Sequence, residues 1–233
     1  MNEFLQNSVF FGAAISLLSY MIGLRLKKRF KSGVFNPLLI SIIITIAVLA
    51  AAHIDYETYN ISAKYLSWFL TPATICLAIP LYEQLSLLKK NFAAVLAGIV
   101  SGVLTSLVTV LILALIFGLS QQEFVTFLPK SITTAIGMDV SRELGGYVTI
   151  TVVVIVITGV LGNISAELIC KVFGIKEPIA KGLAIGSASH AIGTARAMEM
   201  GEIEGAMSSL SIAVAGILTV IGASVFSWIY SLL

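Results

Sequence analysis

The feature that most constrains this chain is the length of its uncharged apolar runs. Residues 92 to 119 carry no Asp, Glu, Lys or Arg, and a helix needs only about 20 apolar residues to cross the hydrocarbon core of a bilayer. In that core an isolated strand cannot satisfy its backbone, so helices are expected even where β-branched residues are frequent. Further runs occupy residues 4–24, 37–52, 65–82, 147–164 and 206–230. The sequence therefore predicts about six full transmembrane helices.

The composition also indicates a membrane protein. The chain has 233 residues, of which 58% are hydrophobic and 11% are charged, whereas a soluble domain carries about 25% charged residues. So few charges cannot build a water-facing surface. We therefore predict an all-α, polytopic membrane protein that forms a single integral domain in a lipid bilayer. The net charge of +2, without basic runs interleaved with aromatic residues, argues against nucleic acid as a partner.

A short polar segment occurs twice in the second half of the chain. Residues 131–137 read SITTAIG, and residues 187–193, fifty-six positions further on, read SASHAIG. A Glu and a Gly follow each copy at the same distances, as Glu143 and Gly145 and as Glu199 and Gly201. Two matching, interrupted polar segments in an apolar chain indicate a transporter-type binding site. The alternative is close packing of membrane helices through small residues, but packing does not require the repeated Glu, the His or the paired hydroxyls.

Both copies are too short and too broken to span the bilayer, so we predict two re-entrant or broken helices. A single crossing separates them, so they enter from opposite faces and form an inverted repeat that meets near the midplane. Residues 1–120 then supply scaffold and oligomerisation spans, and residues 121–233 supply the substrate-binding part. Both termini are expected outside. This topology agrees with the positive-inside rule, because only three of the 14 Lys and Arg residues lie outside, namely Lys64, Lys130 and Arg142.

The two segments together favour an anion site. A helix N-terminus carries about half a positive charge and several unpaired N–H groups, so two that face one cavity can bind an anion. The hydroxyl groups add donors, and neither segment contains an acidic residue, so a small carboxylate suits the site better than a cation. The candidate substrate-binding residues are Ser131, Thr133, Thr134, Gly137, Ser187, Ser189, His190, Gly193, Thr194 and Arg196.

The charged and titratable candidates each have two interpretations. His190 at membrane depth is costly and could couple carboxylate movement to a proton, or it could be a neutral imidazole bonded to a backbone carbonyl of a broken helix. Arg196 could clamp a carboxylate or extend to the inner surface. Glu143 and Glu199 could carry protons, but we favour surface pairing, of Glu143 with Arg142 and of Glu199 with a nearby base.

The remaining motifs predict packing rather than chemistry. Gly98 and Gly102, four residues apart, indicate a close contact with another helix, and we expect a homo-oligomer, with a dimer favoured. The two cysteines, Cys76 and Cys170, provide neither a metal framework nor a disulfide pattern. The sequence contains no HExxH motif and no nucleotide-binding loop. An enzyme, a metal site and a cofactor are therefore not expected.

Several short motifs are spread over nearly the whole chain. They are Asn36-Pro37, Pro80-Leu-Tyr82, Leu128-Pro-Lys-Ser-Ile-Thr133, Glu143-Leu-Gly-Gly146, Lys181-Gly-Leu and Ser189-His-Ala-Ile-Gly-Thr194. In combination they resemble the LrgB/CidB family of bacterial inner-membrane proteins. The resemblance implies a multi-pass protein of the bacterial cytoplasmic membrane and a smaller membrane partner of the LrgA/CidA type.

The resemblance implies two alternative functions. One is holin- or antiholin-like control of murein hydrolase export, autolysis and programmed cell death. The other is carboxylate transport, because a plastid relative exports glycolate and glycerate and some bacterial relatives are tied to pyruvate. That plastid relative also contains an LrgA-like half, which this chain does not resemble. We favour a proton-coupled monocarboxylate carrier that works with a partner. The resemblance then gives functional weight to Ser131, Thr133, Thr134, Ser189, His190 and Thr194.

Overall fold

The computed structural model describes residue 8, residues 10–30 and residues 35–233. All regular structure in these residues is helical, without strands, which confirms the all-α prediction. The chain divides into two compact units, Met1–Cys76 and Leu77–Leu233. Helix α8 (Phe92–Phe117), which we predicted among the scaffold spans, therefore lies in the same unit as both copies of the repeat.

The first unit consists of α2 (Phe11–Phe30), α3 (Pro37–Ala51), α4 (Tyr56–Ala63), the 3-10 helix η1 (Lys64–Phe69) and α5 (Leu70–Cys76). Helix α3 begins where the Asn-Pro pair predicts it. The side chain of Asn36 accepts a hydrogen bond from the backbone N–H of Leu38 at 2.9 Å, and Pro37 suits the first turn because its missing N–H has no helical partner there.

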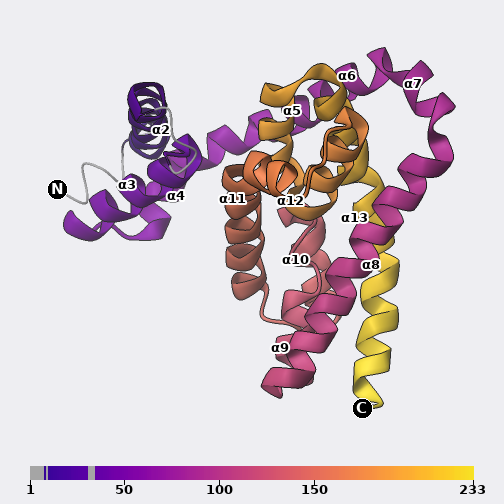
Figure 1. Ribbon diagram of the computed structural model, residues 1–233. Coiled ribbons are helices and arrows are strands. Elements are labelled where there is room, and N and C mark those ends of the chain that lie inside the picture. The colour runs from indigo at the N-terminus through magenta and orange to yellow at the C-terminus, as the bar shows by residue number, and fades with distance from the viewer. Residues whose placement is uncertain (1–7, 9, 31–34) are drawn as a thin grey trace. The chain divides into compact units, whose positions relative to one another are not determined.

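The second unit consists of α6 (Ala78–Glu83), α7 (Leu85–Lys90), α8, α9 (Gln121–Phe127), α10 (Thr134–Glu143), α11 (Val148–Val172), α12 (Pro178–Met200) and α13 (Glu202–Ser231). Helices α8 and α13 run alongside each other, and α12 packs against α8, α11 and α13 (Figure 1). Helix α8 ends at Gly118, whose φ of 62° is the left-handed conformation typical of a helix C-cap. Ser120 and Glu123 then form a capping box that starts α9, and hydrogen bonds from the backbone and hydroxyl of Ser120 lower the pKa of Glu123.

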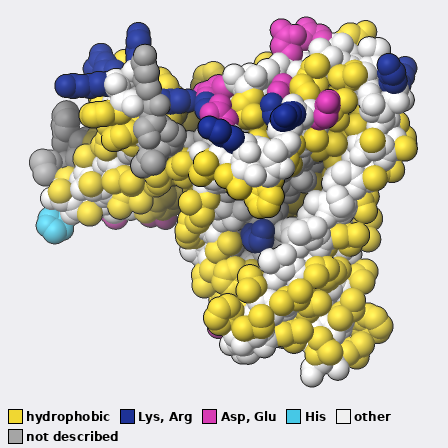
Figure 2. Space-filling view, in the orientation of Figure 1, with side chains coloured by type: hydrophobic (Ala, Val, Ile, Leu, Met, Phe, Trp, Pro, Cys, Tyr) yellow, Lys and Arg dark blue, Asp and Glu magenta, His cyan; other side chains and the backbone are white. Residues whose placement is uncertain are grey.

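One face of α8 forms the core of the second unit. Its buried side chains recur every three or four residues, as Val95, Ile99, Val103, Leu107, Val110 and Ala114, and they pack in one cluster with residues of α9 and α13. Large apolar side chains on the outer faces are exposed, including Ile116 at 70% and Ile217 at 65%. Figure 2 shows that most charged side chains of this unit on the visible face gather towards one end, whereas hydrophobic side chains cover much of the rest. Such a surface suits contact with lipid.

Four stretches of the described residues are long and apolar enough to cross a membrane: 56–83, 92–117, 148–172 and 202–231. They confirm a multi-pass membrane protein, but they are fewer than the six spans predicted. Helix α3 has 15 residues, which is short of the roughly 20 required. The predicted span at residues 4–24 lies partly outside the described residues, and its described part belongs to α2, which continues through Lys27, Lys28 and Arg29.

Both copies of the repeat interrupt a helix, as predicted. In the first copy, turns and bends occupy residues 128–133 between α9 and α10, and α10 has only 10 residues. In the second copy, α12 is interrupted at His190, whose φ of 43° and ψ of −143° are not helical. The two copies thus place their polar residues at breaks in the backbone.

Candidate functional site

Helix α8 contacts Ser131 and Ser187, the first serine of each copy of the repeat. The Ser131 hydroxyl lies 3.1 Å from that of Ser106, and a Cβ added at Gly102 would lie 2.7 Å from the hydroxyl oxygen of Ser187. Gly102 and Ser106 are four residues apart, which is about 6 Å along one helix face. Ser131 and Ser187 are both buried. The structure therefore brings these two positions to consecutive turns of one helix.

The same face of α8 accounts for the glycine pair. A Cβ at Gly98 would lie 3.0 Å from Cδ1 of Leu183, one turn before the contact between Gly102 and Ser187. Gly98 and Gly102 thus lie against α12 within the chain. This contact occupies the face that we associated with oligomerisation.

The first copy leaves the start of α10 without a side-chain cap. Thr133 is the N-cap of α10, but no side chain caps this helix. Thr133 and Thr134 are half-buried. Gly137 serves a different purpose, because it lets α10 pack closely against Ile155 of α11. The uncapped helix start of this copy, rather than its glycine, is therefore available to a ligand.

The second copy directs its polar groups to neighbouring backbone and side chains. His190 is 2% exposed, and its Nε2 lies 3.1 Å from the carbonyl oxygen of Ile155. A carbonyl can only accept, so Nε2 carries the hydrogen. Thr194 donates to the carbonyl of His190 at 2.9 Å, and Ser187 donates to the carbonyl of Leu183 at 2.7 Å. This geometry matches the second interpretation of His190, in which the imidazole satisfies a backbone carbonyl, here one contributed by α11.

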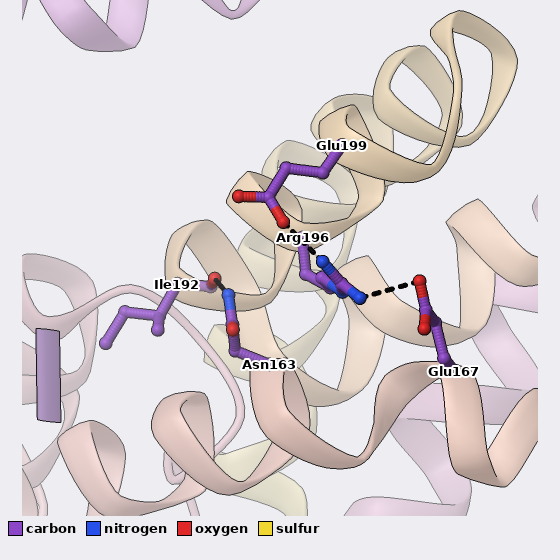
Figure 3. Close-up of polar contacts among 5 residues, drawn as sticks. All are labelled: Asn163, Glu167, Ile192, Arg196 and Glu199. Atoms are coloured by element: carbon purple, nitrogen blue, oxygen red, sulfur yellow. Dashed lines mark hydrogen bonds and ion pairs between the residues drawn. The ribbon is translucent and has the colours of Figure 1, made fainter. Parts of the chain in front are cut away.

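Helix α11 approaches the break in α12 through residues that we did not select from the sequence. A Cβ at Gly159 would lie 2.8 Å from Nε2 of His190, and one at Gly162 would overlap the hydroxyl of Ser189. Asn163 donates to the carbonyl of Ile192 at 2.7 Å (Figure 3). A sequence signal existed, because two glycines and an Asn interrupt an otherwise β-branched run.

The remaining residues of the second copy are buried at the same break. Ser189 is 3% exposed. A Cβ at Gly193 would lie 2.5 Å from that of Ser189, so this glycine permits the tight backbone beyond the break. Thr194 also lies 2.7 Å from the hydroxyl of Ser208 on α13. Helices α11 and α13 therefore hold the break from two sides.

Arg196 does not join the hydroxyl groups of either copy. Its guanidinium pairs with Glu167 of α11 at 2.6 Å and with Glu199 of its own helix (Figure 3). Glu199 thus has the nearby base that we expected. Glu143 is exposed, and Arg142, which we expected to pair with it, pairs with Asp139 at 2.7 Å.

A cavity of about 410 Å³ opens at the charged end of α11, α12 and α13. Its lining includes Glu167, Glu199 and the ion pair between Lys181 and Glu204, whose charged atoms lie 3.8 Å apart. Among the described residues, no group of three His, Cys, Asp or Glu side chains is placed to hold a metal ion. The cavity therefore offers charges of both signs that already face one another.

One basic residue near the first copy has no acidic partner. We counted Lys130 among the basic residues outside the membrane. It is half-buried, and its Nζ donates to the hydroxyl of Ser131 at 3.0 Å. No Asp or Glu in the described part of the chain lies within ion-pair distance of it. The sequence signal was the position of Lys130 directly beside the repeated segment.

The family match and the similar proteins of known sequence all point to one family. The sequence matches the LrgB-like family over residues 16–229. The antiholin-like protein LrgB of Bacillus mycoides (strain KBAB4) is 40% identical over 213 residues, which cover 91% of this chain and 93% of the relative. The proteins of the same name from Bacillus cereus (strain B4264) and Bacillus anthracis (strain CDC 684 / NRRL 3495) match with the same values. No solved structure gives a significant match.

Proposed function

This chain belongs to the LrgB-like family, and from that premise we propose that it carries small monocarboxylates of the glycolate, glycerate, pyruvate and lactate class across the bacterial cytoplasmic membrane. The observation that carries the proposal is the convergence of Ser131 and Ser187 on consecutive turns of α8. Two broken segments that converge on one helix are typical of a transporter site at a repeat interface.

The polar groups at this place suit an anion. Hydroxyl and backbone N–H groups can donate to a carboxylate, and an uncapped helix start adds positive potential. The guanidinium of Arg196 is directed elsewhere, because it is paired with Glu167 and Glu199. A donor-rich site without acidic side chains would reject cations and accept small anions.

Proton coupling is part of the proposal. The bond from Nε2 of His190 to Ile155 exists in both the neutral and the protonated imidazole, so Nδ1 can gain or lose a proton without releasing α11. Glu199 is less suited to this role because it is paired with Arg196. Glu143 is exposed and would have to exchange protons with the aqueous phase directly.

The cellular setting follows from the same premise. We propose an LrgA/CidA-type membrane partner, both termini outside and a homo-oligomer, with a dimer favoured. Access would alternate as α10 and α12 move against the remaining helices. The contacts of Gly98 and Gly102 with α12 suggest that this face serves the internal movement rather than the association of copies.

A second candidate function rests on the name that the curated relatives carry, antiholin-like protein LrgB. It is regulation of murein hydrolase export, autolysis and programmed cell death. In that case the chain would act through association with a holin-like partner, and the donor groups of the first copy would not matter for its activity.

The test is uptake of labelled pyruvate, glycolate, glycerate and lactate into proteoliposomes, with and without an LrgA-type partner. We expect saturable uptake that Ser131→Ala weakens. The control is Ser224→Ala, because Ser224 is exposed and bonds only to the carbonyl of Val220 in its own helix. Absence of uptake in every pairing, together with release of large dyes, would reject the carrier in favour of the holin-related function.

A further inference from the structure

We propose that Lys130 is the cation that binds the substrate carboxylate, at the break between α9 and α10. This inference rests on the proposed carrier function and specifies its site. The observation behind it is a half-buried ammonium group that donates to Ser131 at 3.0 Å and has no acidic partner among the described residues. An ionised side chain that is partly removed from water is costly unless an opposite charge meets it.

The other basic candidates are already occupied. His190 is buried at the contact between α11 and α12, where its Nε2–H bonds to the carbonyl of Ile155. Arg196 is held between Glu167 and Glu199. A carboxylate that bound Arg196 would have to displace an existing partner, whereas a carboxylate at Lys130 would supply a missing one.

The hydrogen-bond directions around Ser131 leave donors for a ligand. An ammonium group can only donate, so the oxygen of Ser131 accepts from Lys130. Ser131 and Ser106 share a bond of 3.1 Å in which either can donate. Whichever serine donates, the hydroxyl hydrogen of the other is left over, and so are two of the three ammonium hydrogens. A carboxylate, with two acceptor oxygens, matches this set.

The start of α10 adds to the same preference. No side chain caps the helix at Thr133, so its first N–H groups keep their positive potential. Thr133 and Thr134 lie half-buried beside it. These groups would orient a second polar group of the substrate, such as the hydroxyl or keto oxygen next to the carboxylate.

The experiment tests whether the site recognises the charge of the substrate carboxylate or only its shape. It measures proteoliposome uptake of whichever of the four labelled acids is taken up best, in competition with the unlabelled acid and with its neutral amide. In the unmodified chain we expect the acid to compete and the amide to compete poorly. Lys130→Gln should raise KM about tenfold or more, the loss expected for one charge-assisted hydrogen bond, and should remove the preference for the acid. Lys130→Arg should retain much of that preference.

The matched control is Lys90→Gln, which makes the same change at an exposed lysine at the end of α7 and should leave uptake unaltered. If Lys130→Gln folds poorly, Lys130→Cys alkylated with 2-bromoethylamine, in a Cys76→Ser background, restores an amine at the same position. Recovery of acid selectivity on alkylation would support the inference.

The outcomes separate the two proposals. If the unmodified chain transports the acid and Lys130→Gln keeps both its KM and its selectivity, Lys130 is not the binding cation and the carrier function stands. If the unmodified chain shows no saturable uptake with any partner, the carrier function fails, and the role of Lys130 fails with it.

Discussion

In the first copy of the repeat, Lys130, Ser131, Thr133 and Thr134 surround a turn and an uncapped helix start. In the second copy, the corresponding polar groups bond to the chain itself: Ser187 bonds within α12, and His190 bonds to α11. The sequences of the two copies match closely. The first copy nevertheless has hydrogen-bond donors to spare, whereas the second uses its donors in bonds within the protein.

This difference suggests a division of roles. A segment with spare hydrogen-bond donors can bind a ligand, whereas a segment whose bonds are satisfied resists deformation. We interpret the first copy as the binding copy and the second as a rigid break held between α11 and α13.

The largest loss of stability is expected from a substitution where α11 contacts the second copy. Gly162→Ala would place a Cβ over the Ser189 hydroxyl and 2.5 Å from the Ser189 Cβ, so α11 and α12 must separate. Overpacking of this kind costs about 1–3 kcal/mol, and we expect a clear fall in the melting temperature of the purified protein.

Gly216→Ala is the control for that substitution. It also adds one methyl group to a helical glycine, but its neighbour is the mobile end of Ile136 at 3.1 Å, which can move aside. An equal fall in melting temperature in Gly162→Ala and Gly216→Ala would show that the contact between α11 and α12 is not unusually tight.

His190 allows a second test, in which two substitutions separate backbone strain from side-chain bonding. His190→Ala keeps a residue with a Cβ at φ 43°, which costs about 1–3 kcal/mol, and also loses the bond to Ile155, worth about 1 kcal/mol. His190→Gly loses the bond but removes the strain. We therefore expect the melting temperature of His190→Gly to exceed that of His190→Ala.

The same pair tests proton coupling. If His190 only holds the break, uptake by His190→Gly should keep the pH dependence of the unmodified chain. If the imidazole carries the proton, both variants should lose that dependence, and the second copy would then be more than a rigid support.

The sequence allows much of this picture to be predicted, but not all of it. Long apolar runs predict helices, and the polar repeat predicts where they break. The partner of His190 is a main-chain carbonyl, which has no sequence signature. The register of α8, which brings Ser106 to Ser131, depends on tertiary packing. Lys130 entered the prediction only as a basic residue on the outside, because sequence alone does not reveal which charges lack partners.

A smaller effect should distinguish the two paired serines. Ser187→Ala removes a hydroxyl that donates to Leu183, so uptake should change little. Ser131→Ala removes the acceptor of Lys130 and a donor to the ligand, and KM should rise several-fold, because a typical hydrogen bond contributes about 0.5–1.5 kcal/mol. If Ser187→Ala raised KM more than Ser131→Ala, the second copy would be the binding copy and the first the rigid one.

The smallest effect is expected at the charged end, where Arg196 joins α12 to Glu167 of α11. The Glu167 side chain is 59% exposed, and exposed ion pairs contribute only about 0–1 kcal/mol. A double-mutant cycle with Glu167→Gln and Arg196→Gln should therefore give a coupling energy in that range for unfolding. The same cycle measured on uptake sharpens the comparison between the copies. If the ion pair merely supports a rigid second copy, the variants should keep both KM and selectivity for the acid over its amide. If Arg196 binds the substrate instead, Arg196→Gln should lose selectivity in the way predicted for Lys130→Gln, and the binding copy would be the second one.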